Sequence, residues 1–154
     1  MRQHTLSLEL IRDIQRAGSD GTASDQERRN QVLLGRFPQH LLAPLKIPDL
    51  EIVTSVAIIE KMIFEHGLTA PVIADLHNLV CSPSAVYQSA SQGDSIVVLT
   101  IQITRQLPVI AAIKLDKPDS AGKPNIHWLA SAYPKDHTEM FKRWQKQGLL
   151  LWQK

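Results

Sequence analysis

The chain has 154 residues, of which 44% are hydrophobic and 21% are charged, and its formal net charge at pH 7 is +2. This length suits one folded domain and leaves little room for a second. The apolar runs are shorter than the ~20 residues needed to span a bilayer, and the N-terminus lacks the hydrophobic stretch of a signal peptide. We therefore expect a soluble, cytoplasmic protein without membrane contact, or a piece of a larger protein.

Cysteine content and charge distribution narrow the possible chemistry. Cys81 is the only cysteine, which excludes an internal disulfide and a cysteine-based zinc site, and we interpret it as a small buried residue rather than a nucleophile. Residues 1–104 hold eight Lys/Arg and eleven Asp/Glu, a net charge of −3, whereas residues 105–154 hold nine and four, a net charge of +5. The basic third is either a solvated face or a surface that binds a polyanion such as RNA.

The first 31 residues are predicted to be a short helix followed by a linker. Thr5 or Ser7 can cap a helix that Gly18 ends and whose apolar stripe contains Leu6, Leu10, Ile11 and Ile14. Residues 18–24 have the composition of a flexible link, and residues 25–29 that of a short solvated helix. We therefore separate residues 1–31 from a second unit, residues 32–154.

Residues 34–84 are predicted to hold a proline-rich run, a strand and two helices. Three prolines in residues 34–50 predict an ordered but irregular segment, and residues 51–54 a short strand. Ser55 can cap a helix over residues 55–65, and His66 falls on its inward stripe with Val56, Ile59, Met62 and Ile63. Thr69 caps a second helix, with Pro71 in its first turn, which ends at residues 81–84.

The central prediction is a pair of antiparallel strands. Residues 95–104 and 107–116 are rich in β-branched side chains and are joined by a connection too short for a crossover. The apolar face is assigned to Val97, Leu99, Ile101 and Ile103 on the first strand and to Leu107, Val109, Ala111, Ile113 and Leu115 on the second. We expect the helix over residues 55–65 to cover this face, and a further strand over residues 85–89 to precede it.

The C-terminal part is predicted to contain a strand, a helix and a short terminal strand. Alternation over residues 126–132 places four side chains on one face: His127, Leu129, Ser131 and Tyr133. Asp136 and Glu139 form a helix start, and Gly148 ends a helix with Met140, Phe141 and Trp144 inward and Lys142, Arg143 and Lys146 partly outward. The whole chain is predicted to be α+β, with N-terminal helices packed on an antiparallel sheet of four to six strands.

The absence of several sequence motifs favours metal-free acid–base chemistry. No P-loop, G-x-G-x-x-G, H-E-x-x-H, G-x-S-x-G or EF-hand pattern occurs, and the six histidines are not spaced as metal ligands. We therefore expect no metal and no cofactor. Histidine with serine, tyrosine and basic residues suits RNA cleavage, because the substrate supplies its own 2′-hydroxyl nucleophile.

A series of segments in fixed order resembles a known family. These segments are L-L-G-R-F-P-Q-H-L, I-V-T-S-V-A-I-I-E-K-M-I-F-E-H-G-L, P-S-A-V-Y-Q-S, S-I-V-V-L-T, P-V-I-A-A-I-K-L-D, S-A-Y-P-K-D and W-Q-K-Q-G-L-L-L-W. Over roughly residues 32–153 the chain resembles the C-terminal domain of phage MuF-type head proteins. That domain also occurs in polymorphic toxins and is grouped with nucleases of the barnase–EndoU–colicin–RelE type.

The resemblance implies a nuclease-like helix-and-sheet fold and ribonuclease toxin activity. By position, the family's H-G-L histidine falls on His66, its strand-end serine on Ser89, and its S-x-Y on Ser131 and Tyr133. The family often has glycine after that tyrosine, whereas this chain has Pro134. We expect His66 to lie in a cleft within reach of the other three side chains.

Three functional hypotheses remain open from the sequence. The first is a metal-independent endoribonuclease with His66 as general acid or base, acting in the cytoplasm of a host or target bacterium. RNA is then the partner, bound in part by Lys142, Arg143 and Lys146, and an immunity or antitoxin protein is a candidate second partner. The second is a non-catalytic module that binds nucleic acid or protein, and the third is an ADP-ribosyltransferase toxin.

Overall fold

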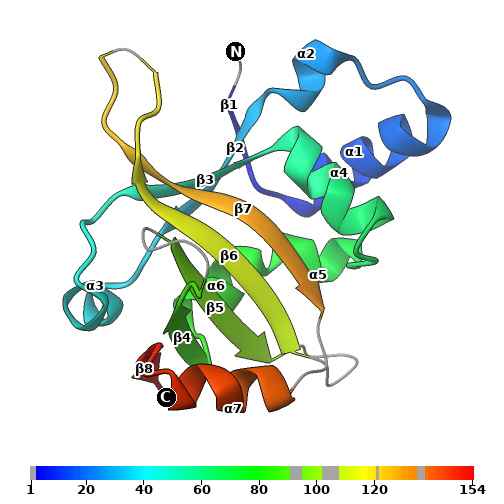
Figure 1. The fold of residues 1–154 in the computed structure, drawn as a ribbon. Helices are drawn as coiled ribbons and strands as arrows, with labels where there is room; N and C mark the ends of the chain where they lie inside the picture. The colour runs from blue at the N-terminus through cyan, green and yellow to red at the C-terminus, as the bar shows by residue number, and fades with distance from the viewer. Residues whose placement is uncertain (1–2, 91–94, 102–107, 121, 135–137) are drawn as a thin grey trace.

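The computed structural model describes residues 3–90, 95–101, 108–120, 122–134 and 138–154 (Figure 1). This part of the chain contains eight strands and seven helices. The strands are β1 (Gln3–Thr5), β2 (Gln31–Arg36), β3 (Glu51–Ser55), β4 (Ala85–Gln88), β5 (Ser95–Ile101), β6 (Pro108–Lys117), β7 (Ile126–Pro134) and β8 (Leu150–Gln153). The helices are α1 (Leu8–Asp20), α2 (Asp25–Arg28), α3 (Gln39–Leu45), α4 (Val56–Phe64), α5 (Ala70–Ala74), α6 (Leu76–Cys81) and α7 (Thr138–Lys146).

The strands form one mixed sheet in the order β1-β2-β3-β7-β6-β5-β4-β8. The pairs β1/β2 and β3/β7 are parallel, and the other neighbours are antiparallel. The α+β class is therefore confirmed, whereas the purely antiparallel sheet of four to six strands is wrong for the described residues. Two additions account for the larger number of strands: β1, a three-residue strand without apolar alternation, and β2, which was not predicted. The parallel pairing of β3 with β7 joins two predicted strands and was not expected.

The predicted central hairpin is confirmed in its pairing. Strands β5 and β6 are antiparallel neighbours, with Ser95 opposite Lys114 and Ile101 opposite Pro108. Residues 102–107, which include the predicted ends Ile103, Thr104 and Leu107, lie outside the described residues. The predicted face of β5 is wrong by one residue: Ile96, opposite Ile113, shares the buried cluster with Val109 and Ala111. A one-residue shift in register moves every side chain to the other face of a sheet, and the sequence of apolar residues did not determine this register.

Helices cover one face of the sheet and bury the main core. In Figure 1, α5 and α6 lie behind β6 and β7, whereas α7 lies below them at one end of the sheet. The main core includes residues from both layers, among them Ile59, Ile73, Val86, Ile113 and Leu129. A smaller cluster on the other face joins Ala85, Tyr87 and Ile110 to Phe141 of α7. We call this other face, which β4, β6 and β7 present away from α4–α6, the open face.

Helix α4 forms as predicted but lies nearer to β3 and β7 than to the central hairpin. Ser55 begins it, because its extended backbone places the hydroxyl oxygen to accept from the Ile58 N–H at 3.2 Å. Such a cap stabilises a helix by about 1 kcal/mol. Val56, Ile59 and Met62 form its buried stripe. The main helix contact of β5 is with α6 instead.

The N-terminal residues pack on this body. Strand β1 pairs with β2, and α1 contacts α4 and α5. The predicted end of α1 at Gly18 is wrong, because the helix continues to Asp20 and Gly21 provides the left-handed C-cap. A side chain at Gly18 would place its Cβ 2.5 Å from the Phe64 ring, so glycine permits the close helix contact. The division at residue 31 stays a prediction.

The proline-rich run is more regular than expected. Residues 34–50 contain the end of β2, the helix α3 with Pro44 inside it, and the segment that leads to β3. Leu41, Leu45 and Ile47 are buried in the main core, so the segment packs on the body. Among the described residues, no helix combines the length and hydrophobicity required to cross a membrane.

Candidate functional site

Two of the predicted site residues, Ser131 and Tyr133, lie on the open face of β7. In the ladder with β6, Ser131 is opposite Ala112 and Tyr133 is opposite Ile110. Residues two apart in an uninterrupted strand share a face, and Tyr133 packs with the cluster of Tyr87, Ile110 and Phe141. Ala132 between them belongs to the main core on the other face. The predicted common face of Ser131 and Tyr133 is therefore confirmed.

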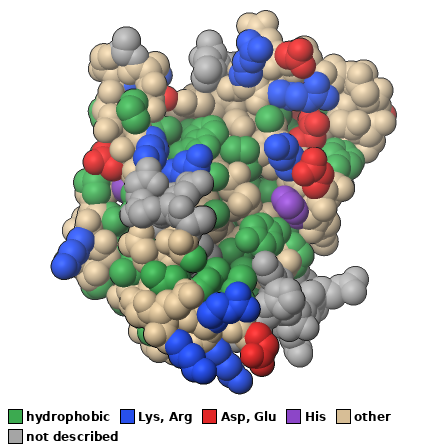
Figure 2. All heavy atoms as spheres, viewed as in Figure 1, with side chains coloured by type: hydrophobic (Ala, Val, Ile, Leu, Met, Phe, Trp, Pro, Cys, Tyr) green, Lys and Arg blue, Asp and Glu red, His purple; other side chains and the backbone are tan. Residues whose placement is uncertain are grey.

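The surface around this cluster is apolar with a basic border. Figure 2 shows hydrophobic side chains over the sheet and Lys and Arg side chains gathered at the bottom, over α7. The apolar part contains Tyr133, Met140, Trp144 and Leu150, all partly exposed. Lys142, Arg143 and Lys146 are exposed on α7, while Phe141 is buried. The predicted inward and outward sides of this helix are thus confirmed, although the predicted start at Asp136 lies outside the described residues.

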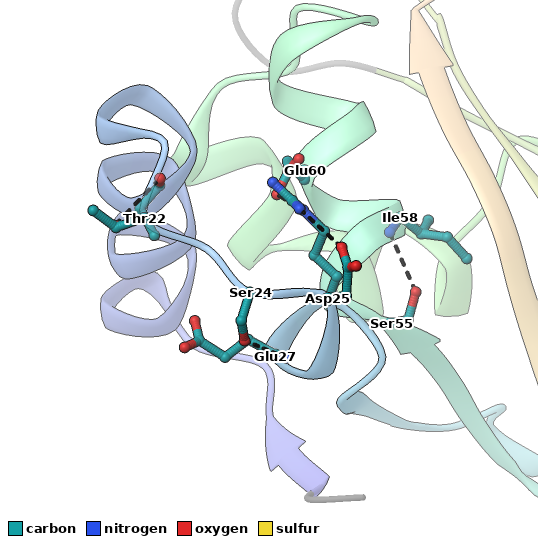
Figure 3. A network of polar contacts seen from close by, with 9 residues as sticks. Thr22, Ser24, Asp25, Glu27, Ser55, Ile58 and Glu60 are labelled. Carbon is teal, nitrogen blue, oxygen red and sulfur yellow. Dashed lines mark hydrogen bonds and ion pairs between the residues drawn. The ribbon is translucent and has the colours of Figure 1, made fainter.

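Helix α4 leads directly into His66. At the middle of the helix, Glu60 Oε2 accepts a hydrogen bond from the Arg28 Nε at 3.2 Å, which connects α2 to α4 (Figure 3). At its end, the His66 N–H donates to the Lys61 carbonyl at 3.0 Å, and Gly67 turns the chain with a φ of 68°. The Leu68 N–H then donates to the Met62 carbonyl. His66 is therefore held half-buried just beyond the helix.

The rings of His66 and Tyr133 meet at the far end of β7. Their centroids are 5.5 Å apart and their planes are inclined by 41°. The pairing of β3 with β7 involves only His127 and Trp128, so the later residues of β7 have no strand neighbour on that side within the described sheet. Helix α4 approaches there. Within the described part of the chain, no hydrogen bond to either imidazole nitrogen of His66 occurs.

Ser89 does not join this pair. The ladders place Tyr133 in one row with Ile110, Leu99 and Ala85, and Ser89 lies four residues beyond Ala85. At ordinary strand spacing, this is a separation of about 14 Å across the sheet and about 13 Å along it. The structure therefore brings together the rings of His66 and Tyr133, with Ser131 two residues from Tyr133 on the same face, and places Ser89 far from them. The expected cleft stays a prediction. Strand order, which places β4 three strands from β7, could not be read from the sequence.

His127 was predicted to share a face with Ser131 and Tyr133, and this is wrong. A bulge at Ala130 interrupts the alternation, because Ile113 pairs with Leu129 and Ala112 with Ser131. His127 is completely buried on the helix-covered face. Its Nδ1 accepts from the Asp116 N–H at 3.1 Å, so Nε2 carries the proton and donates to the Pro48 carbonyl at 2.9 Å.

The environment of His127 makes it a structural residue. Burial lowers the pKa of its imidazole, an effect that the Pro48 carbonyl and the Asp116 and Asp49 carboxylates partly oppose. The Phe37 ring packs beside it at 5.8 Å. Both nitrogens are engaged with backbone groups, so the side chain ties β7 to the segments before β3 and at the end of β6.

Cys81 is also structural. Burial raises the pKa of its thiol to about 11, so it is protonated at neutral pH and is a poor nucleophile. Its Sγ lies 3.4 Å from the Arg36 carbonyl oxygen and 3.3 Å from His77 Nε2, which itself donates to that carbonyl at 3.0 Å. The described residues contain no group of three or more His, Cys, Asp or Glu side chains able to hold a metal ion.

Comparison with known proteins gives one finding. A family model described as the phage MuF C-terminal domain matches residues 57–154. This confirms the resemblance seen in the sequence, with a start at residue 57 instead of near residue 32. Neither the curated proteins nor the solved structures give a significant match.

Proposed function

The chain belongs to the phage MuF C-terminal domain family, and we propose that it is a metal-independent endoribonuclease whose reaction site contains His66 and Tyr133. The observation that carries the proposal is the ring contact of 5.5 Å between these two residues. A histidine that served only to end a helix would not require a tyrosine from a distant strand beside it. The exposed cations of α7, at the same end of the sheet, support an anionic substrate.

The proposed chemistry uses the RNA itself as the nucleophile. The 2′-oxygen attacks the adjacent phosphorus, the bond to the 5′-oxygen breaks, and the products are a 2′,3′-cyclic phosphate and a 5′-hydroxyl. His66 takes the proton from the 2′-hydroxyl or gives one to the leaving 5′-oxygen, and water exchanges the other proton, so that the 2′-oxygen loses one proton and the 5′-oxygen gains one. The Tyr133 hydroxyl donates to a phosphate oxygen as negative charge develops there, and Ser131 is close enough on the same face to assist. No metal or cofactor is required in this scheme.

The proposal includes a finer fold assignment, to the barnase–EndoU–colicin–RelE type of nuclease. A helix layer on one face of the sheet and an open face on the other support it, because RNA needs access to the strands that carry the site. The ribonuclease-toxin role that the sequence resemblance implies belongs to the same proposal.

Incubation of the purified chain with total RNA in EDTA tests the proposal. We expect fragments that end in 2′,3′-cyclic phosphate, and we expect His66→Ala to lose about 100-fold or more of the cleavage rate. His40→Ala is the matched control, because His40 is an exposed histidine whose ring contact is with Trp152 instead. Intact RNA with the parent protein, or equal cleavage by a folded His66→Ala variant, would refute it.

A non-catalytic binding module is the second candidate. The apolar character of the open face favours it, since the partly exposed side chains of Tyr133, Met140, Trp144 and Leu150 form a surface that a partner could cover. The same assay separates the two functions, because a binding module retains RNA or protein without producing cyclic phosphate ends.

A further inference from the structure

The open face has a second feature at the end of β7 opposite to His66 and Tyr133. A hollow of about 460 Å³ lies there between β1, β2, β7 and the loop that joins β6 to β7. Trp128, Lys117, Lys123, Asp119 and Gln31 contribute to its walls. We call it the Trp128 hollow. A neighbouring hollow of about 230 Å³ shares Asp119 and Lys123 with it.

Polar contacts hold the walls of the Trp128 hollow in place. The Gln31 side-chain amide donates to Asp119 Oδ1 at 2.6 Å and connects the loop to β2. The Asn125 side chain donates to Asp116 Oδ1 at 2.9 Å, and the Lys123 N–H donates to the Ser120 carbonyl at 3.0 Å. The loop is thereby fixed over the sheet, so the hollow is formed before any ligand arrives.

Trp128 faces the same side of the sheet as Tyr133. It pairs with Lys114, next to the core pair of Ile113 and Leu129, and therefore lies on the open face. Tyr133 is five residues after Trp128 and would lie on the opposite face of a regular strand. The extra residue Ala130 in the bulge reverses the alternation, so Tyr133 lies on the same face as Trp128, about 13 Å further along the strand. One extended ligand can therefore reach both places.

The walls combine an aromatic ring with cations and one acceptor. Trp128 is half-buried, which leaves part of its ring for stacking, and Lys123 is exposed at the rim. An aromatic platform beside lysines is the combination that binds unstacked bases and their phosphates. The Asp119 carboxylate, held by Gln31, can accept a hydrogen bond from an exocyclic amino group of a base.

We propose that the Trp128 hollow binds one nucleotide of a single-stranded RNA whose cleaved phosphate lies at His66 and Tyr133. The base stacks on Trp128, and Lys123 contacts the phosphate. This inference rests on the proposed function for the identity of the ligand, but its test does not require cleavage.

The test uses a short, fluorescently labelled single-stranded RNA of mixed sequence and the full chain with His66→Ala, which prevents cleavage. In that background, Trp128→Ala should weaken binding by about 5- to 150-fold, the range for loss of one stacked base. Lys123→Gln should weaken binding and make the slope of log K against log salt less negative by about 0.7. Arg16→Gln, an exposed charge on α1 outside the hollow, is the matched control and should change neither.

A second variant covers the possibility that Trp128→Ala does not fold. Trp128→Phe keeps an aromatic ring and should bind more weakly than the background protein and more tightly than an alanine variant. Folded Trp128 and Lys123 variants that bind like the background protein would overturn the inference, even if the parent cleaves RNA. Loss of binding in these variants, together with intact RNA in the parent assay, would support the hollow and refute the ribonuclease. An RNA that does not bind at low salt would also overturn the inference and leave the hollow to a protein partner.

Discussion

The two histidines at the ends of strand β7 differ in burial and in hydrogen bonding. At the first end, His127 is completely buried, and both of its nitrogens bond to backbone groups. At the second end, His66 is half-buried beside Tyr133, and its nitrogens have no hydrogen-bond partner among the described residues. The first end has strands on both sides, whereas the second has β6 on one side and α4 on the other.

The difference shows how the number of neighbouring strands determines whether a histidine is enclosed by protein groups or partly exposed. A strand with neighbours on both edges and helices over its face excludes water, so a polar side chain there must find protein partners. A strand that loses one neighbour leaves room for a side chain from another layer to reach its edge. The length of β3, which ends at Ser55 and turns directly into α4, sets where this change occurs.

Removal of the His127 ring should have the largest effect. His127→Ala leaves the Asp116 N–H and the Pro48 carbonyl without partners and opens a cavity beside Phe37. We expect a loss of about 3 kcal/mol or more in the free energy of unfolding, measured by urea denaturation. An unchanged denaturation midpoint would show that the two ends of β7 do not differ as described.

Removal of the His66 ring should give the converse result. His66→Ala should lower the RNA cleavage rate by ~100-fold, equal to about 2.7 kcal/mol in activation free energy, because the proposed proton-transfer group is lost. Its unfolding free energy should fall by less than about 1 kcal/mol, since a half-buried ring without described hydrogen bonds contributes little. A variant that loses stability and activity together would assign His66 to the core.

The cations of α7 test whether the proposed RNA contacts the protein near the second end of β7. Neutralising Lys142, Arg143 and Lys146 together should weaken RNA binding and make its salt slope less negative by up to about 2 units, because each phosphate contact on a single strand contributes about 0.7. Stability should hardly change, because the three side chains are exposed. Replacement of Lys46, Lys61 and Arg16 by glutamine is the control with equal charge loss. If both triple variants bind alike, the α7 cations form an ordinary solvated face.

Acidification should lower the free energy of unfolding through His127. The folded-state pKa of His127 is lowered from 6.5, so the unfolded chain takes up a proton first as the pH falls. The stability linked to this group is therefore complete above about pH 6.5 and decreases as the pH falls through the folded-state pKa, by at most about 1.4 kcal/mol per pH unit. Urea denaturation at pH 7.5, 6.5 and 5.5 measures it. The slope should be smaller in His127→Gln, and an equal slope would exclude His127 as its source.

The sequence predicted local elements better than their arrangement. Caps and apolar stripes located α1 and α4, and two β-branched runs with a short connection located the central hairpin, because those features depend on residues close together in the chain. The glycine at position 18 was interpreted as a helix end, whereas it lies against the Phe64 ring of another helix and Gly21 is the C-cap. The strand order and the parallel pairs depended on long-range packing, for which the sequence carries no local signal.

The site was predictable in part for the same reason. His66 at a helix end and Tyr133 two residues after Ser131 could be identified from spacing and from the family resemblance. The exclusion of His127 required the bulge at Ala130, which no glycine or proline marks, and that of Ser89 required the position of β4. The Trp128 hollow could not be predicted, because residues of the β6–β7 loop form part of its wall and the sequence indicated only a long connection there.

The smallest expected effect is that of Tyr133→Phe, which tests the second end of β7 most specifically. The substitution keeps the ring that packs against His66 and Ile110 and removes only the hydroxyl. Unfolding free energy should therefore change by less than about 1 kcal/mol, and the cleavage rate should fall by about 10-fold if the hydroxyl stabilises charge on the phosphate. Tyr87→Phe is the matched control, because Tyr87 lies in the same cluster but is almost fully buried. Equal cleavage rates for both variants and the parent would limit Tyr133 to packing and leave His66 as the sole proton-transfer group of the pair. A loss of cleavage in Tyr133→Phe that persists at saturating RNA would assign the hydroxyl to the chemical step rather than to binding.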